Sequence, residues 1–158
     1  LGRGIVTQAV DEARLERTGE AVAPRPGAKA RSFVLCGPPL PGHEIEVRDG
    51  AGARLGEQRV GRVFARGPSL MQGYYRDAEA TRVALSPDGW LDTGDLGYFA
   101  EGQVVITGRA KDLVIINGRN IWPQDLEWTA ESEVEGLRSG DVAVFSVDED
   151  GGGERVIA

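Results

Sequence analysis

The 158-residue chain carries 18 Lys and Arg and 25 Asp and Glu residues, a formal net charge of −7, with one cysteine and one histidine. Its basic residues are scattered, whereas nucleic-acid-binding surfaces concentrate them on one face, so we expect no nucleic-acid partner. A single cysteine excludes an internal disulfide, and a single histidine excludes a zinc site built on a histidine pair. No apolar run is long enough to span a bilayer. We expect a soluble, cytoplasmic protein.

The first part of the chain is expected to contain one helix and three strands. Apolar residues among charged ones over 4–17 favour a short amphipathic helix, and prolines and glycines make 18–31 a loop or linker. Strands are expected at 32–36, 44–48 and 60–66. Together these elements predict a small antiparallel β subdomain.

The next segment is expected to turn at its glycines and prolines and then to form a helix. Asp77 is a candidate N-cap, because alanines with good helix propensity follow it. We expect Tyr74 and Tyr75 to pack this helix against the β subdomain. We expect His43 to be an exposed loop residue rather than a catalytic one.

The second half of the chain begins with a predicted hairpin. The apolar segments 96–99 and 104–107 flank the turn Ala100-Glu101-Gly102. A further strand is expected at 113–116, followed by a helix over 123–137 that starts at a proline. Two final strands are expected at 141–147 and 155–158. The tryptophans at 122 and 128 are expected to pack rather than to bind a ligand.

Four charged residues stand between these predicted elements and indicate a polar ligand: Asp95, Arg109, Lys111 and Asp112. Asp95 follows a glycine that permits close backbone approach, and its carboxylate can accept two hydroxyl hydrogens, which matches a vicinal ribose diol. Arg109 offers a rigid donor fork that suits a ribose or phosphate oxygen. It could equally form an ion pair with Asp112 or Asp95.

Several ordered motifs support a family resemblance. They are GPPLPG at 37–42, VGRVFARGPSLMQGYYRDAEAT at 60–81, TGD at 93–95, GRAKD at 108–112 and NGRNIWPQDLE at 117–127. Over roughly residues 34–148 the chain resembles the adenylate-forming superfamily, which includes acyl-CoA synthetases, luciferases and nonribosomal-peptide adenylation domains. The segment KDLVIINGRNIWPQDLEW is most similar to the fatty acyl-AMP ligase branch.

The resemblance assigns roles to individual residues. Asp95 would bind the ribose hydroxyls of ATP and acyl-AMP, and Arg109 would contribute to nucleotide binding. Lys111 would be the hinge between a large domain and a mobile C-terminal lid domain. Gly118 would line the pantetheine passage, although it could merely turn a hairpin. The catalytic lysine of the family would lie beyond this chain, so we expect no catalytic residue in it.

The resemblance also implies a domain organisation and an α+β fold. Residues 1–110 would be the C-terminal part of the large domain, as a small antiparallel β subdomain. Residues 111–158 would be the first half of the α+β lid domain. Residues 1–36 would correspond to an insertion that is typical of the ligase branch, because a long segment precedes the GPP turn.

By resemblance, the chain is a fragment of a fatty acyl-AMP ligase of lipid, polyketide or nonribosomal-peptide biosynthesis. Such an enzyme uses Mg²⁺ and ATP to convert a fatty acid into acyl-AMP and pyrophosphate. It then passes the acyl group to the phosphopantetheine thiol of an acyl carrier protein. The phosphate loop and magnesium motif are missing here, so we expect the fragment alone to be inactive. The alternatives are an acyl-CoA synthetase, with coenzyme A as acceptor, an amino-acid adenylation domain, or a non-catalytic interaction module.

Overall fold

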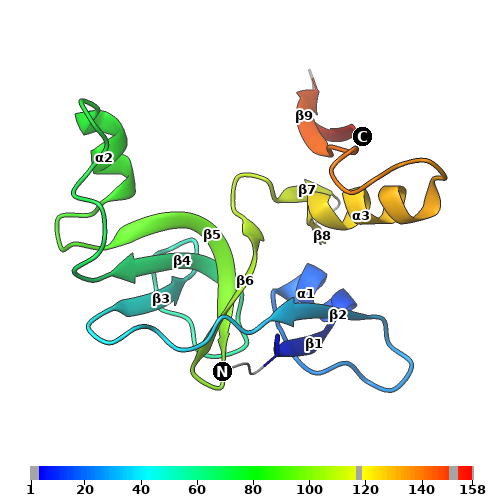
Figure 1. The fold of residues 1–158 in the computed structure, drawn as a ribbon, viewed down its shortest axis with the longest axis horizontal. Helices are drawn as coiled ribbons and strands as arrows, with labels where there is room; N and C mark the ends of the chain where they lie inside the picture. Colours follow the sequence, from blue (N-terminus) through cyan, green and yellow to red (C-terminus); the bar gives the residue numbers. More distant parts are fainter. Residues whose placement is uncertain (1–3, 117–118, 150–152, 158) are drawn as a thin grey trace. The chain divides into compact units, whose positions relative to one another are not determined.

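The computed structural model describes residues 4–116, 119–149 and 153–157. The chain divides into two compact units, Leu1–Ala110 and Lys111–Ala158. Both units combine antiparallel strand pairs with short helices (Figure 1), so the predicted α+β fold is confirmed. No helix in the described ranges is long and apolar enough to cross a membrane.

From residue 4 onwards, the first unit contains six strands and two helices. In chain order they are β1 (Thr7–Asp11), α1 (Glu12–Thr18), β2 (Ala30–Val34), β3 (Glu44–Arg48), β4 (Gly61–Arg66), α2 (Ala78–Ala84), β5 (Leu91–Ala100) and β6 (Gln103–Arg109). Strands β3 to β6 form one antiparallel sheet in sequential order, and β1 pairs with β2. The chain after β2 joins the sheet at Val104 of β6, whose amide donates to Gly37 O at 2.9 Å and whose carbonyl accepts from Cys36 N at 2.8 Å.

The core of the first unit is built from strand residues, from Trp90 just before β5 and from Leu15 of α1. Its buried side chains include Val10, Leu15, Phe33, Val47, Val63, Trp90, Leu96, Tyr98, Val104 and Val105. Tyr98 is completely buried and packs edge-on against Phe33, with ring centroids 6.3 Å apart. Its hydroxyl donates to Gln8 Oε1 at 2.9 Å. The tyrosine therefore buries a large apolar ring while its polar tip keeps a hydrogen bond.

The predicted hairpin is confirmed as β5 and β6. Glu101 and Gly102 form its two-residue turn, with φ of 51° and 72°. Two consecutive positive φ values are typical of the turn type that matches strand twist. The carboxylate of Glu57 accepts from both turn amides, at 3.2 Å from Glu101 N and 2.8 Å from Gly102 N. This tight turn fixes the pairing of Ala100 with Gln103, and this pair sets the register of the neighbouring residues of the hairpin.

The helix predicted over 4–17 is wrong in its first half, where β1 pairs with β2 instead. Val10 is fully buried in that strand, and Asp11 then caps α1 by accepting from Arg14 N at 3.0 Å. A strand of five residues followed by a helix of seven gives a mixed periodicity that resembles one longer helix. The loop or linker predicted over 18–31 is a loop up to β2, which begins at Ala30, and it packs on the unit: Ala21 is buried and Glu20 forms an ion pair with Arg59.

The predicted N-cap of α2 is confirmed, since Asp77 Oδ1 accepts from Ala80 N at 2.8 Å. The predicted packing of Tyr74 and Tyr75 is wrong: the two residues are 52% and 85% exposed, and α2 buries none of its residues. The prediction for His43 is only partly right. Its ring is partly buried, and its two nitrogens lie 3.3 Å from Pro41 O and 2.7 Å from Ser69 Oγ.

In the second unit, the described residues form two strand pairs and one helix. They are the pair β7 (Val114–Ile116) and β8 (Arg119–Ile121), the helix α3 (Pro123–Glu133), and the pair β9 (Phe145–Glu149) and β10 (Gly153–Ile157). Helix α3 starts at Pro123 as predicted but ends before Val134, where the backbone becomes extended. Trp122 is buried, as its predicted packing role requires, whereas Trp128 is 62% exposed and that prediction is wrong.

Gly97 offers a test of the β5–β6 packing. A Cβ added to it would lie 2.3 Å from Val105 O and 3.0 Å from Val63 Cγ2, so Gly97→Ala should lower the free energy of unfolding by about 1–3 kcal/mol. At Gly50 an added Cβ meets nothing within 4 Å, so Gly50→Ala should change it by less than about 1 kcal/mol. Urea unfolding followed by tryptophan fluorescence measures both. Equal stability of the two variants would contradict this packing.

Tyr98 predicts a pH dependence of stability. Burial raises the pKa of Tyr98 to about 12, above the ordinary value of about 10. The unfolded chain therefore releases this proton first, and stability should fall as the pH rises from about 10 towards 12. Urea unfolding at a series of pH values in wild type and in Tyr98→Phe isolates the effect, because other titrating groups are common to both. Parallel pH profiles would contradict the prediction.

Candidate functional site

The Thr93-Gly94-Asp95 motif lies inside β5 rather than between two strands. The pairing of β4 with β5 places Phe64 opposite Asp92 and Arg62 opposite Leu96. Three residues of β5 therefore stand opposite one residue of β4, Val63. Such a bulge breaks the regular ladder and redirects side chains, and bulges are often found next to active sites.

Side chains within the bulge bind its own backbone. Asp92 Oδ1 accepts from Gly94 N at 3.0 Å, and Thr93 Oγ1 accepts from Asp95 N at 3.1 Å. The Thr93 hydroxyl also donates to Val63 O at 2.9 Å, which ties the bulge to β4. Gly94 adopts a φ of 75°, a left-handed conformation that favours glycine. The motif is therefore held both by its own side chains and by Val63 of β4.

A second irregularity, in β6, brings Arg109 opposite Asp95. The ladder pairs Gly97 with Ile106 but Leu96 with Gly108, so Thr107 is an extra residue on β6. In a regular ladder Thr107 would pair with Leu96, and Gly108 would pair with Asp95. One inserted residue shifts the register by one position and turns the following side chains to the other face. The extra residue thus decides which side chain faces Asp95.

Asp95 and Arg109 form a direct ion pair. Arg109 Nε lies 3.1 Å from Asp95 Oδ1, and Arg109 Nη1 donates to Thr93 O at 3.3 Å. The Asp95 side chain is 26% exposed and that of Arg109 57% exposed, so a ligand can reach both. Among the described residues, Asp95 Oδ2 accepts no hydrogen bond. Of the two ion pairs that the sequence left open for Arg109, the structure contains the one with Asp95.

The other predicted site residues lie in the second unit. Lys111 is exposed and is the first residue of that unit, directly after Ala110, whose amide donates to Gly94 O at 2.8 Å. Asp112 is partly buried. Gly118 lies outside the described residues. The structure therefore brings together Asp95 and Arg109 within the first unit, and it places Lys111 where the two units join along the chain.

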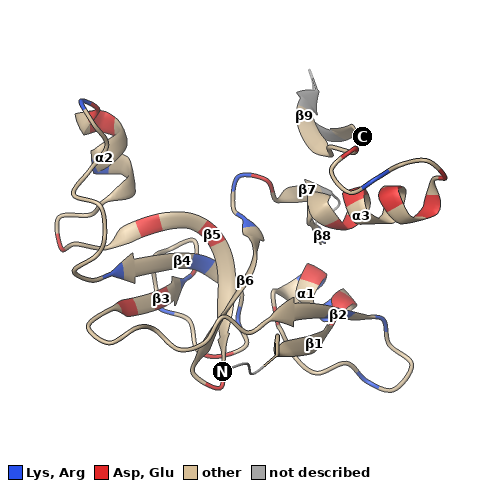
Figure 2. Cartoon of the chain, viewed as in Figure 1, with Lys and Arg blue, Asp and Glu red and all other residues tan. Residues whose placement is uncertain are grey.

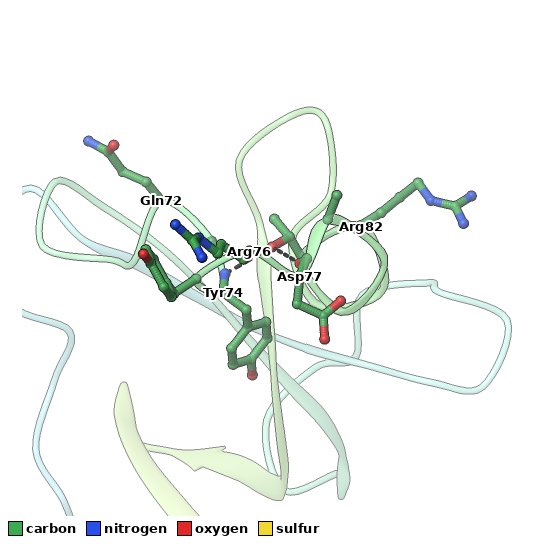
Figure 3. Close-up of a pocket in the computed structure, with 9 residues that line it drawn as sticks. Gln72, Tyr74, Arg76, Asp77 and Arg82 are labelled. Carbon is green, nitrogen blue, oxygen red and sulfur yellow. Dashed lines mark hydrogen bonds between the residues drawn. The ribbon is translucent and has the colours of Figure 1, made fainter.

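A groove near α2 does not involve these residues. Figure 3 shows its lining, which comes from residues 72–78 and from Thr81 and Arg82. The Tyr74 amide donates to Thr81 Oγ1 at 2.9 Å, which fixes the loop before the helix. None of the predicted site residues lines the groove. It is an open surface of the α2 region, separate in its residues from the Asp95–Arg109 pair.

Sequence reasoning missed two residues that support the site, Asp92 and Arg62. Asp92 has a local signal, because an aspartate two residues before a glycine commonly accepts from that glycine's amide. Arg62 has none: it comes from β4, and its Nη2 lies 2.9 Å from Asp92 Oδ2. Figure 2 shows acidic residues on β3 and β5 and basic residues on β4, and β3 also ends at the basic Arg48.

Metal ligands are sparse in the described part of the chain. It holds no group of three or more His, Cys, Asp or Glu side chains that could bind a metal ion. The chemistry available here is instead one carboxylate oxygen and one guanidinium, both accessible and held by backbone bonds. Such a pair suits a neutral diol next to an anionic group, because the carboxylate accepts from hydroxyls and the guanidinium donates to oxygens.

No protein-family model matches the chain, but individual proteins do. A Caulobacter vibrioides protein, provisionally named acyl-CoA synthetase, is 56% identical over 148 residues, which is 93% of this chain and 26% of that protein. The medium-chain-fatty-acid–[acyl-carrier-protein] ligase JamA of Moorena producens is 38% identical over 80% of this chain and 23% of JamA. The chain thus spans about a quarter of the length of these relatives.

Solved structures give the same result. A structure described for fatty acyl-adenylate ligases from E. coli and L. pneumophila has a TM-score of 0.83 and 45% identity, covering 97% of this chain and 27% of that one. McyG A-PCP complexed with phenylalanyl-adenylate has a TM-score of 0.70 and 37% identity, covering 80% of this chain and 22% of that one. These identities and the motifs agree, and the chain belongs to the adenylate-forming ligase superfamily.

Proposed function

We propose that this chain is the ribose-binding part of a longer fatty acyl-AMP ligase. The full protein would activate a fatty acid with ATP to acyl-AMP and pyrophosphate, and would pass the acyl group to an acyl carrier protein thiol. The observation that carries the proposal is the Asp95–Arg109 pair, with Asp95 in a bulge of β5 and Arg109 opposite it on β6. The 45% identity to a fatty acyl-adenylate ligase structure and the match to JamA support this branch.

The geometry of the pair explains how it would hold the nucleotide. Among the described residues nothing donates to Asp95 Oδ2, which could accept from ribose hydroxyls, while Arg109 Nε holds Oδ1 and restricts the motion of the carboxylate. The half-exposed guanidinium of Arg109 retains donors for a ribose or phosphate oxygen. Because the backbone of the bulge is already bonded, little ordering cost remains when the nucleotide binds. The contribution to rate would be the orientation of the α-phosphate for attack by the carboxylate substrate.

We propose that 1–110 is the end of the large domain and 111–158 the start of the mobile lid, with Lys111 as the hinge. The division of the chain into compact units after Ala110 and the exposure of Lys111 support this assignment. A hinge needs a few element-terminal residues that absorb large backbone changes. Residues 1–36 would be the ligase-branch insertion. Mg²⁺, when bound, would neutralise charge on the phosphates and would take its ligands mainly from outside this chain.

An acyl-CoA synthetase is the second candidate, because the Caulobacter vibrioides relative with that name is 56% identical. Both candidates share the first half-reaction and differ in the thiol that accepts the acyl group. Pyrophosphate release by the full-length protein, with ATP and a fatty acid, tests the shared step. Acyl-AMP that accumulates with coenzyme A present but is consumed by a carrier protein supports the ligase. Rapid formation of acyl-CoA supports the synthetase instead.

Asp95→Asn should impair this reaction strongly in the full-length protein. It removes the charge that accepts from the ribose hydroxyls, and a hydrogen bond to a charged group contributes about 1.5–3 kcal/mol, so kcat/KM for ATP should fall by roughly 10- to 100-fold. Fatty-acid-dependent pyrophosphate release measures it.

Asp49→Asn is the matched control for this charge change. Asp49 Oδ1 accepts from Ala51 N and Ala53 N, and an asparagine oxygen can accept both bonds. The control should leave kcat/KM for ATP within about twofold, since roughly 0.4 kcal/mol corresponds to that ratio. Equal activity of the two folded variants would remove Asp95 from the site. A wild-type protein that releases no pyrophosphate with any acid would support the non-catalytic module.

A further inference from the structure

Arg48 of β3 and Arg62 and Arg66 of β4 each form an ion pair with a carboxylate. One of these carboxylates, Asp92, also accepts a backbone hydrogen bond. Arg48 pairs with Glu46 at 2.9 Å, and Arg66 with Glu44 at 2.7 Å. Both also lie over the Trp90 ring, at 4.8 and 4.7 Å from its centroid. These contacts stay within the neighbouring side chains of the sheet and fasten the strands together.

Arg62 differs in the partner it holds. Its Nη2 lies 2.9 Å from Asp92 Oδ2, and the other oxygen of Asp92 accepts from Gly94 N at 3.0 Å. A carboxylate held on one oxygen by a guanidinium is restricted in rotation about its side chain. The direction in which it accepts from Gly94 N is therefore set by Arg62. Gly94 is the residue with positive φ at the centre of the bulge and immediately precedes Asp95.

We propose that Arg62 is a positioning residue for nucleotide binding. Through Asp92 it fixes the Gly94 peptide, and through that peptide it fixes the backbone from which the Asp95 carboxylate projects. The inference rests on the function proposed above for Asp95. It adds a residue from a different strand, which acts without touching the nucleotide.

The location of Arg62 explains why its loss should affect nucleotide affinity more than folding. It is the last β4 residue paired with β5 before the bulge, opposite Leu96. Its side chain is 48% exposed and that of Asp92 22% exposed, so the ion pair adds little to global stability. A small displacement of a binding group, however, directly weakens binding of its ligand. Loss of Arg62 should thus affect nucleotide affinity more than folding.

The test uses the full-length protein and the variant Arg62→Met, which keeps the aliphatic stem and loses the guanidinium. The KM for ATP in pyrophosphate release and the Kd for AMP should both rise by about three- to tenfold, with kcat and the KM for the fatty acid changed less than about twofold. Arg62→Lys should restore most of the affinity, since a lysine can still pair with Asp92.

Arg59→Met is the matched control. Arg59 forms an ion pair with Glu20 at 2.6 Å, and the exposures of that pair, 52% and 24%, are close to those of Arg62 and Asp92. It should leave the KM for ATP unchanged. Equal KM values for the Arg59→Met and Arg62→Met proteins would overturn the positioning role, as would a lower melting temperature for Arg62→Met without any change in nucleotide affinity.

A double-variant comparison separates positioning from direct contact. Asp92→Asn keeps an acceptor for Gly94 N but loses the charge that holds Arg62. If Arg62 acts through Asp92, adding Arg62→Met to Asp92→Asn should raise the KM for ATP by less than about 1.5-fold further. A full additional rise would mean that Arg62 contacts the nucleotide itself and would overturn the proposal. A wild-type protein that binds no AMP would overturn both this inference and the proposed function.

Discussion

The structure of the candidate site depends on one constraint: three residues of β5 must fit opposite a single residue of β4. A bulge of this size removes backbone groups from the ladder, and each needs another partner. The motif supplies them locally, because Asp92 and Thr93 bind amides two residues ahead and Gly94 adopts the required positive φ. Asp95 is then the residue of the motif whose side chain remains for a ligand.

The neighbouring strand must adjust to the same constraint. The extra residue Thr107 in β6 shifts the ladder so that Arg109, rather than Gly108, stands opposite Asp95. Ala110 follows and donates to Gly94 O, so the end of β6 is bonded directly to the centre of the bulge. The same few backbone bonds thus shape the site and the last residue of the first unit. The site and the boundary between the units are parts of one local arrangement.

Local signals in the sequence predicted the elements that local chemistry determines. The turn at Glu101 and Gly102, the cap at Asp77 and the proline start of α3 all follow from the preferences of a few adjacent residues. The segment 4–17 was misassigned because pairing with β2, some twenty residues away, determines its first half. Exposure of Tyr75 and Trp128 could not be derived either, since burial depends on what the tertiary fold places beside a ring.

The same distinction holds for the site. Asp95 and Arg109 are recognisable from their motifs, and pairing between them was one of two alternatives. The Asp92 contact follows an i, i+2 pattern that sequence can indicate, whereas Arg62 reaches the motif across thirty positions of chain. The register shift at Thr107 is likewise a property of two strands together. Residue types could therefore be derived from the sequence, but the network that orients them required the pairing of β4, β5 and β6.

The way the four-stranded sheet ends has a consequence for self-association. An unpaired strand edge is a template on which another chain can add a strand and aggregate. The outer strand β3 carries Glu44, Glu46 and Arg48, and its Val47 carbonyl is already occupied by Leu55 N at 2.7 Å. At the opposite edge, the chain after β2 forms backbone bonds with Val104 of β6. Charged side chains protect the β3 edge, and the chain's own backbone covers part of the β6 edge. Both features disfavour strand exchange between copies and the growth of intermolecular sheets.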